Sequence, residues 1–145
     1  LICTGNKFSQ DEEDKLSKLH IKNKTLQINA SDKELSELYT RASLFVFPSL
    51  YEGFGIPILE AYACHCPIAI SNTSCFPEIA GDAAIYFDPY SVKDIANTIE
   101  AIIYNPQKAN ELIQKGIKRL ELYSWEKTVL ETEETYKKTI QGYNF

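Results

Sequence analysis

The chain has 145 residues, of which 44% are apolar, 12% aromatic and 24% charged, and these proportions exclude a disordered, fibrous or low-complexity protein. Its net charge of −5 argues against a nucleic-acid partner, because binding a long polyanion requires a basic face. No apolar run approaches the ~20 residues that span a bilayer. A small anion remains a possible ligand, since helix N-termini bind phosphate without a basic surface.

Short apolar segments alternate with helical patterns along most of the chain. Strands are predicted at 1–4, 25–28, 43–47, 67–70 and 84–87. Helices are predicted at about 10–22, 32–42, 57–65, 76–80, 92–104, 107–122 and 125–141. The apolar runs at 43–47 and 67–70 are continuous, which is typical of strands buried on both faces. The alternation predicts right-handed βαβ units and a parallel α/β sheet.

The predicted helices begin at residues that can cap them. Ser9 with Glu12, and Ser31 with Glu34, have the capping-box spacing, in which the hydroxyl and the carboxylate bind each other's backbone N–H groups. Ser91 and Ser124 are further N-cap candidates. After Ser91, a stripe at three- and four-residue spacing predicts the apolar face of a helix, formed by Val92, Ile95, Ala96, Ile99, Ile102 and Ile103.

The domain organisation follows from the same pattern. We expect one domain, with a βα core at 1–104 and C-terminal helices at 105–145. The sequence contains no Met and opens directly in a strand-like run, so we expect the chain to be a fragment of a longer protein.

Four cysteines, Cys3, Cys64, Cys66 and Cys75, lack the spacing of a zinc site. Because Cys3 and Cys64 lie in apolar segments, we expect reduced thiols rather than a disulfide or a metal site. Reduced thiols indicate a reducing compartment, hence the cytoplasm.

The segment after the third predicted strand, residues 48–57, is the most informative. Gly53 and Gly55 allow a ligand to approach the backbone closely, and Pro57 suits the first turn of a helix. The loop would therefore present free N–H groups and a helix N-terminus to an anion such as phosphate. Glu52 and Glu60, the latter predicted in the first helical turn, would accept hydrogen bonds from ligand hydroxyl groups. The residues alone equally allow a tight turn followed by a carboxylate that interacts with the helix dipole.

Residues 48–61 resemble the Glu-x7-Glu signature of the large family of retaining glycosyltransferases known as glycosyl transferases group 1. The order of the surrounding segments is also similar, namely the opening strand ending at Gly5 and residues 31–35, 67–69, 76–78, 87–89 and 124–125. The resemblance implies a Rossmann-like parallel sheet with extra C-terminal helices, the donor-binding C-terminal half of a two-domain GT-B enzyme. It also implies that the first strand of that domain is central and precedes residue 1.

The resemblance further implies the role of each motif residue. Glu60 would accept hydrogen bonds from the nucleotide ribose, and Glu52 would face the transferred sugar as the catalytic-site carboxylate. The amides of Gly53, Phe54 and Gly55 would contact the sugar and the diphosphate. The donor would be a nucleotide-diphosphate sugar, with retention at the anomeric carbon and no metal or other cofactor.

The resemblance also leaves parts of the enzyme outside this sequence. An N-terminal acceptor domain would be a partner, and it could bring the enzyme to the inner face of a membrane. The Arg and Lys that neutralise the diphosphate would lie in an earlier βα unit. The segment 26–30 lacks the glycine usual after the second strand, which leaves its contacts to the base open.

Two other classes of protein compete with this interpretation. One is a non-catalytic α/β nucleotide-binding module, such as a response-regulator-like domain, for which Asp88 at a strand end is the candidate acid; Pro89 makes it look like a turn former. The other is an assembly module that docks a partner through its C-terminal helices, supported by the aromatic residues Trp125, Tyr136, Tyr143 and Phe145.

Overall fold

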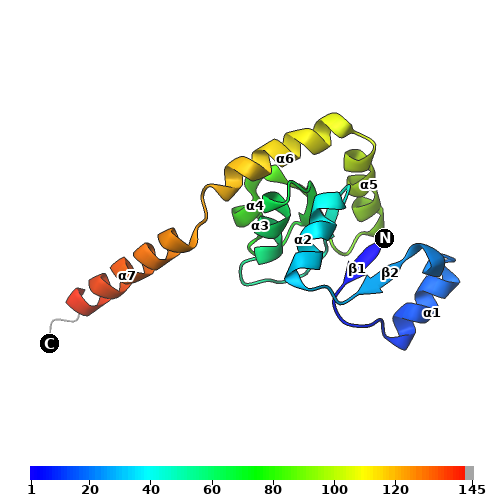
Figure 1. The fold of residues 1–145 in the computed structure, drawn as a ribbon, viewed down its shortest axis with the longest axis horizontal. Coiled ribbons are helices and arrows are strands. Elements are labelled where there is room, and N and C mark those ends of the chain that lie inside the picture. Colours follow the sequence, from blue (N-terminus) through cyan, green and yellow to red (C-terminus); the bar gives the residue numbers. More distant parts are fainter. Residues whose placement is uncertain (143–145) are drawn as a thin grey trace. The chain divides into compact units, whose positions relative to one another are not determined.

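The computed structural model describes residues 1–142 and has the alternating α/β pattern expected from the sequence (Figure 1). The strands are β1 (Ile2–Thr4), β2 (Leu26–Ile28), β3 (Phe45–Phe47), β4 (Ile68–Ser71) and β5 (Ile85–Phe87). The α-helices are α1 (Gln10–Lys18), α2 (Asp32–Arg41), α3 (Ile56–Ala63), α4 (Phe76–Ala80), α5 (Val92–Ile103), α6 (Pro106–Leu120) and α7 (Trp125–Gly142). All five predicted strands are confirmed. The chain forms two compact units that divide after Leu38.

In the first unit, β1 and β2 pair in parallel, with Ile2 opposite Leu26 and Thr4 opposite Ile28. Helix α1 connects them and ends at Lys18, so the prediction of one helix over 10–22 was wrong. A short 3₁₀ turn, η1 (Lys22–Lys24), follows instead.

A left-handed residue ends α1. His20 has a φ of 56°, and the Ile21 N–H donates back to the Leu16 carbonyl at 3.1 Å. This is the hydrogen bond of a Schellman motif, which stops a helix. Non-glycine residues are uncommon in this conformation, so the histidine does not indicate in the sequence that the helix ends here.

In the second unit, β3, β4 and β5 form a parallel sheet in that order. Every residue of β4 is buried, which confirms the predicted double burial of this central strand. The residues of β3 are only half-buried, so the same prediction was wrong for β3. Within the described residues, β3 pairs with a strand on one edge alone, and an edge strand has less of its surface covered.

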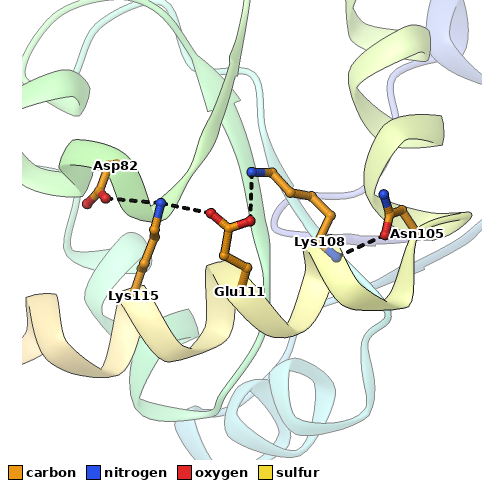
Figure 2. Close-up of polar contacts among 5 residues, drawn as sticks. All are labelled: Asp82, Asn105, Lys108, Glu111 and Lys115. Atoms are coloured by element: carbon orange, nitrogen blue, oxygen red, sulfur yellow. Dashed lines mark hydrogen bonds and ion pairs between the residues drawn. The ribbon is translucent and has the colours of Figure 1, made fainter.

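The predicted caps form as expected. The Ser9 hydroxyl and the Glu12 carboxylate complete a capping box at α1, and the Ser31 N–H donates to the Glu34 carboxylate at 2.8 Å at α2. The hydroxyls of Ser91 and Ser124 accept from N–H groups in the first turns of α5 and α7, at 3.2 and 3.1 Å. The N-cap of α6, which the sequence analysis did not identify, is Asn105 (Figure 2).

One part of the core of the second unit lies between the sheet and helices α5 and α6. It is a cluster of buried side chains, Ala69, Phe87, Ile102 and Leu112. Helices α3 and α4 bury further large side chains, among them Ile58, Tyr62 and Phe76. The apolar face of α5 is narrower than the predicted stripe, because Val92 is 84% exposed and Ile103 is 45% exposed. Thr98, a polar residue outside the stripe, is buried instead.

Helix α6 packs against α3 and the short helix η2 (Gly81–Ala83). The side chain of Tyr62 occupies the space beside Gly116, where any Cβ atom would lie 2.4 Å from the tyrosine ring. Figure 2 shows a surface row of charges along α6, in which the Lys115 ammonium bridges Glu111 and Asp82. Exposed ion pairs of this kind contribute little to stability. The contact between Tyr62 and Gly116 is therefore the one that stabilises the packing of α6 on α3.

The last helix, α7, has no buried residue. Its aromatic residues Trp125 and Tyr136 are 78% and 66% exposed, so they lie outside the core of the described chain. Tyr143 and Phe145, the other members of the aromatic-rich end, lie outside the described residues. Among residues 1–142, none of the helices is long and apolar enough to cross a membrane.

Candidate functional site

The candidate site is built on the loop between β3 and α3, residues 48–55. Because β3 and β4 are parallel neighbours, the loops that follow them leave the same edge of the sheet. Ligands of open α/β sheets bind at this edge, outside the carboxyl ends of the strands.

Hydrogen bonds tie the β3 loop to the β4 loop. The Ser74 hydroxyl donates to the Glu52 carbonyl at 2.8 Å and accepts from the Glu52 N–H at 3.3 Å. The Cys75 thiol lies 3.3 Å from the Glu52 carbonyl and 3.1 Å from that of Phe54. Ser74 itself has a left-handed backbone, with a φ of 54°. Two residues of the β4 loop therefore fix the backbone on both sides of Gly53.

Glu52 itself is half-buried. The Ser49 hydroxyl donates to its Oε1 atom at 2.9 Å. A carboxylate offers about four lone-pair positions, so most of its capacity to accept hydrogen bonds remains. Ser49 lies within the motif segment 48–61, and its three-residue spacing from Glu52 is the sequence signal for this contact.

Gly55 is the residue at which the loop enters α3. It is buried, has a φ of 91°, and lies against the ring of Phe76. A Cβ atom here would come within 3.1 Å of Phe76 Cε1 and 3.2 Å of Ile58 Cδ1. Both the backbone conformation and the space therefore require glycine. Pro57 lies in the first turn of α3, as predicted.

The backbone N–H groups of residues 53–56 donate no hydrogen bond to any residue in the described part of the chain. They include the N-terminal amides of α3, where the partial positive charge of the helix dipole lies. Gly53 and Phe54 are exposed, so a ligand can reach this stretch. Successive free N–H groups at a helix N-terminus can donate hydrogen bonds to an anion such as a phosphate group.

Glu60 is the fifth residue of α3, so its predicted place in the first turn was wrong. The helix begins at Ile56, one residue before Pro57. Glu60 is half-buried, and the Tyr39 hydroxyl donates to its Oε2 atom at 3.4 Å. Within residues 1–142, neither Glu60 nor Glu52 forms an ion pair. Both carboxylates are thus available to neutral donors such as ligand hydroxyls.

The Phe54 side chain packs on another aromatic ring. It lies edge-on to Tyr123, with ring centroids 5.7 Å apart. The Tyr123 hydroxyl donates to the Ile79 carbonyl at 3.3 Å, and the Arg119 guanidinium donates to the same carbonyl at 2.9 Å. Sequence analysis did not link these C-terminal residues to the loop, because the contact joins positions about seventy residues apart.

At the end of β5, the alternative candidate site, the Asp88 carboxylate takes part in a local turn. A cavity of about 350 Å³ at this strand end is lined by Asn72, Tyr86, Phe87, Asp88 and Asp94. Asp88 Oδ1 accepts from the Tyr90 N–H at 2.9 Å, so the carboxylate shapes its own turn, as Pro89 suggests.

None of the four cysteines forms a disulfide within residues 1–142, and Cys66 is the one among them that is fully buried. Burial raises the pKa of the Cys66 thiol to about 11. Cys3, Cys64 and Cys75 are half-buried.

Comparison with known proteins shows the family of this chain. Residues 1–119 match the family described as glycosyl transferases group 1. The chain belongs to this family. The match spans both compact units and includes the whole β3–α3 loop.

One relative and two solved structures illustrate what this chain is similar to. The O-antigen chain mannosyltransferase B of Escherichia coli is 38% identical over 106 residues, which are 73% of this chain and 28% of the relative. The sucrose-phosphate synthase of Thermosynechococcus elongatus has a TM-score of 0.84 at 23% identity, covering 98% of this chain and 39% of that one. Anabaena HepE, solved in complex with UDP, has a TM-score of 0.84 at 17% identity, covering 94% and 40%.

These comparisons show the Rossmann-like fold of the C-terminal half of a GT-B glycosyltransferase. The chain spans little more than a quarter of the length of the E. coli mannosyltransferase.

Proposed function

We propose that this chain is the donor-binding part of a retaining glycosyltransferase, which moves a sugar from a nucleotide-diphosphate sugar to an acceptor. The observation that carries the proposal is the β3–α3 loop, where free amides lie between two carboxylates that form no ion pair among the described residues. The fold shared with the UDP complex of Anabaena HepE supports a nucleotide-sugar donor. The mannosyltransferase relatives make mannose the first sugar to test.

Each group of the loop has a proposed role. Glu60 accepts from the two ribose hydroxyls, the amides of Gly53, Phe54 and Gly55 bind the sugar and the diphosphate, and Glu52 faces the transferred sugar. Glu52 is the catalytic residue because it lies beside the reacting ring, where hydrogen bonds that strengthen in the transition state accelerate transfer. No metal is needed in this scheme, since the amides and the helix dipole counter the phosphate charge.

The acceptor would bind outside these 145 residues, on an N-terminal domain of the full-length enzyme. The reduced thiols favour the cytoplasm as its compartment, with the acceptor domain at the inner membrane face where the acceptor is a lipid.

The test of the nucleotide role is a titration of the full-length enzyme with UDP, GDP and ADP and with the corresponding sugars. The Glu60→Ala variant should bind its preferred nucleotide about 10- to 1,000-fold more weakly, because charge-assisted hydrogen bonds contribute ~1.5–3 kcal/mol each. Glu100→Ala, which removes an exposed carboxylate from α5, is the matched control. Equal affinities for the two variants would contradict the ribose role.

The same enzyme separates the role of Glu52 from that of Glu60. Glu52→Gln should lower kcat far more than it lowers nucleotide affinity, since its contacts are realised at the sugar. A non-catalytic nucleotide-binding module would bind the nucleotide and transfer no sugar from any donor of the panel. An equal loss of nucleotide affinity and of kcat in Glu52→Gln would contradict the proposed role of Glu52 at the transferred sugar.

A further inference from the structure

Tyr39 lies 21 residues before Glu60, on the helix that precedes β3, and belongs to no part of the Glu-x7-Glu motif. Its side chain is 6% exposed, and its hydroxyl donates to Glu60 Oε2 at 3.4 Å. A buried phenol hydroxyl usually needs a partner, because an unsatisfied donor in the interior is costly. Glu60 is the partner that the structure provides.

The Tyr39 ring is fixed by a row of aromatic contacts that leads to the other half of the site. It packs edge-on to Phe45 at 5.1 Å between centroids, Phe45 stacks on Phe47 at 5.5 Å, and Phe47 lies 5.1 Å from Phe76. Phe76 is the ring on which Gly55 rests. Tyr39, which contacts Glu60, and Phe76, which contacts Gly55 of the candidate loop, are thus the two ends of one row of packed aromatic rings.

From this arrangement we infer that Tyr39 is a positioning residue, which holds the Glu60 carboxylate so that its remaining lone pairs face the two hydroxyls of the nucleotide ribose. The inference rests on the proposed donor-binding function. Tyr39 occupies one position on Oε2 and leaves Oε1 and the rest of Oε2 available. A carboxylate restrained in advance loses less rotamer freedom on binding, which increases affinity.

The protonation state of Tyr39 supports this role. Burial, together with the charge of Glu60 and the hydrogen bond between them, raises the pKa of the Tyr39 hydroxyl well above its ordinary value of 10. The hydroxyl therefore stays protonated throughout the physiological range and remains a donor toward the carboxylate.

The decisive measurement compares ribonucleotides with their 2′,3′-dideoxy counterparts. In the full-length enzyme, calorimetry gives the affinity ratio between UDP and 2′,3′-dideoxy-UDP, or between GDP and its counterpart where GDP is preferred. Tyr39→Phe keeps the ring and its packing and removes only the hydroxyl. We expect this variant to lower the ratio about three- to tenfold, with dideoxynucleotide affinity unchanged.

Tyr62→Phe is the matched control. Tyr62 lies on the same helix as Glu60, is 2% exposed, and its hydroxyl has no hydrogen-bond partner within residues 1–142. Deleting that hydroxyl should leave the ratio at the wild-type value. Thermal unfolding of both variants shows whether either change acts through stability instead.

Glu60→Gln separates this inference from the proposed function. If Glu60→Gln lowers the ratio and Tyr39→Phe does not, Glu60 binds the ribose without help from Tyr39, and the inference is overturned. If Glu60→Gln leaves the ratio unchanged, the ribose role fails, and the positioning role fails with it. If Tyr39→Phe weakens both nucleotides equally, Tyr39 supports the fold rather than the ribose contact, and the inference is again overturned.

Discussion

Gly53 and Gly55 are two residues apart in one loop, yet the structure makes different demands on them. A Cβ atom at Gly53 would meet nothing within 4 Å, and its φ lies outside the left-handed region. Gly55 has a φ of 91° and contacts the ring of Phe76. The sequence indicates that both are glycines of a turn. The structure shows that shape requires glycine at position 55, whereas position 53 has room for a side chain.

This difference predicts opposite outcomes for two alanine substitutions. Gly55→Ala should destabilise the protein by about 2–4 kcal/mol, because it adds backbone strain of ~1–2 kcal/mol and forces Phe76 or Ile58 to move. Gly53→Ala should lower the free energy of unfolding by less than about 1 kcal/mol, because the added Cβ atom meets no neighbour. Chemical denaturation of the two variants measures both values. Equal stability would mean that the loop relaxes around Gly55 without cost.

The residues that hold the site were harder to predict than the residues that form it. Glu52, Glu60 and the glycines stand together in the sequence, so their pattern makes this loop a candidate ligand site. Tyr39 and Ser74 reach the site from distant segments, 21 and 22 residues away from their partners. Local patterns cannot report such contacts, because they arise from the packing of α2 and of the β4 loop.

At the scale of elements, local chemistry predicted where helices begin better than where they end. Serine residues cap the starts of α1, α2, α5 and α7 through hydrogen bonds made by their own side chains. The ends of α1 and α3 are instead marked by His20 and His65, both with a φ of 56°. At α3, the Cys66 N–H donates to the Ala61 carbonyl at 2.9 Å, which completes a Schellman motif. Glycine is the usual residue there, so histidine gave no signal.

The left-handed histidine at the end of α3 can be tested directly. His65 is exposed, so its side chain contributes little packing, while its Cβ atom strains the left-handed backbone. His65→Gly should therefore raise the free energy of unfolding by about 0.5–1 kcal/mol. Chemical denaturation measures the change, and His65→Ala, which keeps the Cβ atom, is the control. A less stable glycine variant would show that the His65 side chain makes a contact of its own.

At the scale of the whole molecule, the paired strands leave open edges. Within the described residues, β1 pairs with β2 alone and β3 with β4 alone. An open edge exposes unpaired N–H and carbonyl groups, to which another chain can add a strand. The apolar residues Leu1, Ile2 and Leu26 of the first unit are 74%, 50% and 56% exposed.

Helix α7 adds a second exposed apolar surface. Trp125, Val129, Tyr136 and Ile140 lie within one narrow stripe of the helix, and each is more than 60% exposed. The opposite face has the ion pairs Lys127–Glu131 and Lys138–Glu134. An amphipathic helix with an uncovered stripe is a place for association, because burying that stripe removes apolar surface from water.

These two surfaces predict how the 145-residue chain behaves when it is expressed alone. It should self-associate or unfold with low cooperativity, transfer no sugar, and bind nucleotide sugars more weakly than the full-length enzyme. Size-exclusion chromatography with light scattering measures self-association, and calorimetric unfolding measures cooperativity.

Two double variants identify the surface responsible. Ile2→Thr with Leu26→Thr keeps β-propensity and removes the exposed apolar pair of β1 and β2. Val129→Gln with Ile140→Gln removes two exposed apolar side chains from α7. Whichever pair restores a monomer identifies the surface responsible. A wild-type chain that is monomeric, unfolds cooperatively and binds donor with the affinity of the full-length enzyme would contradict the prediction, because both exposed surfaces would then be tolerated by an independently folded domain.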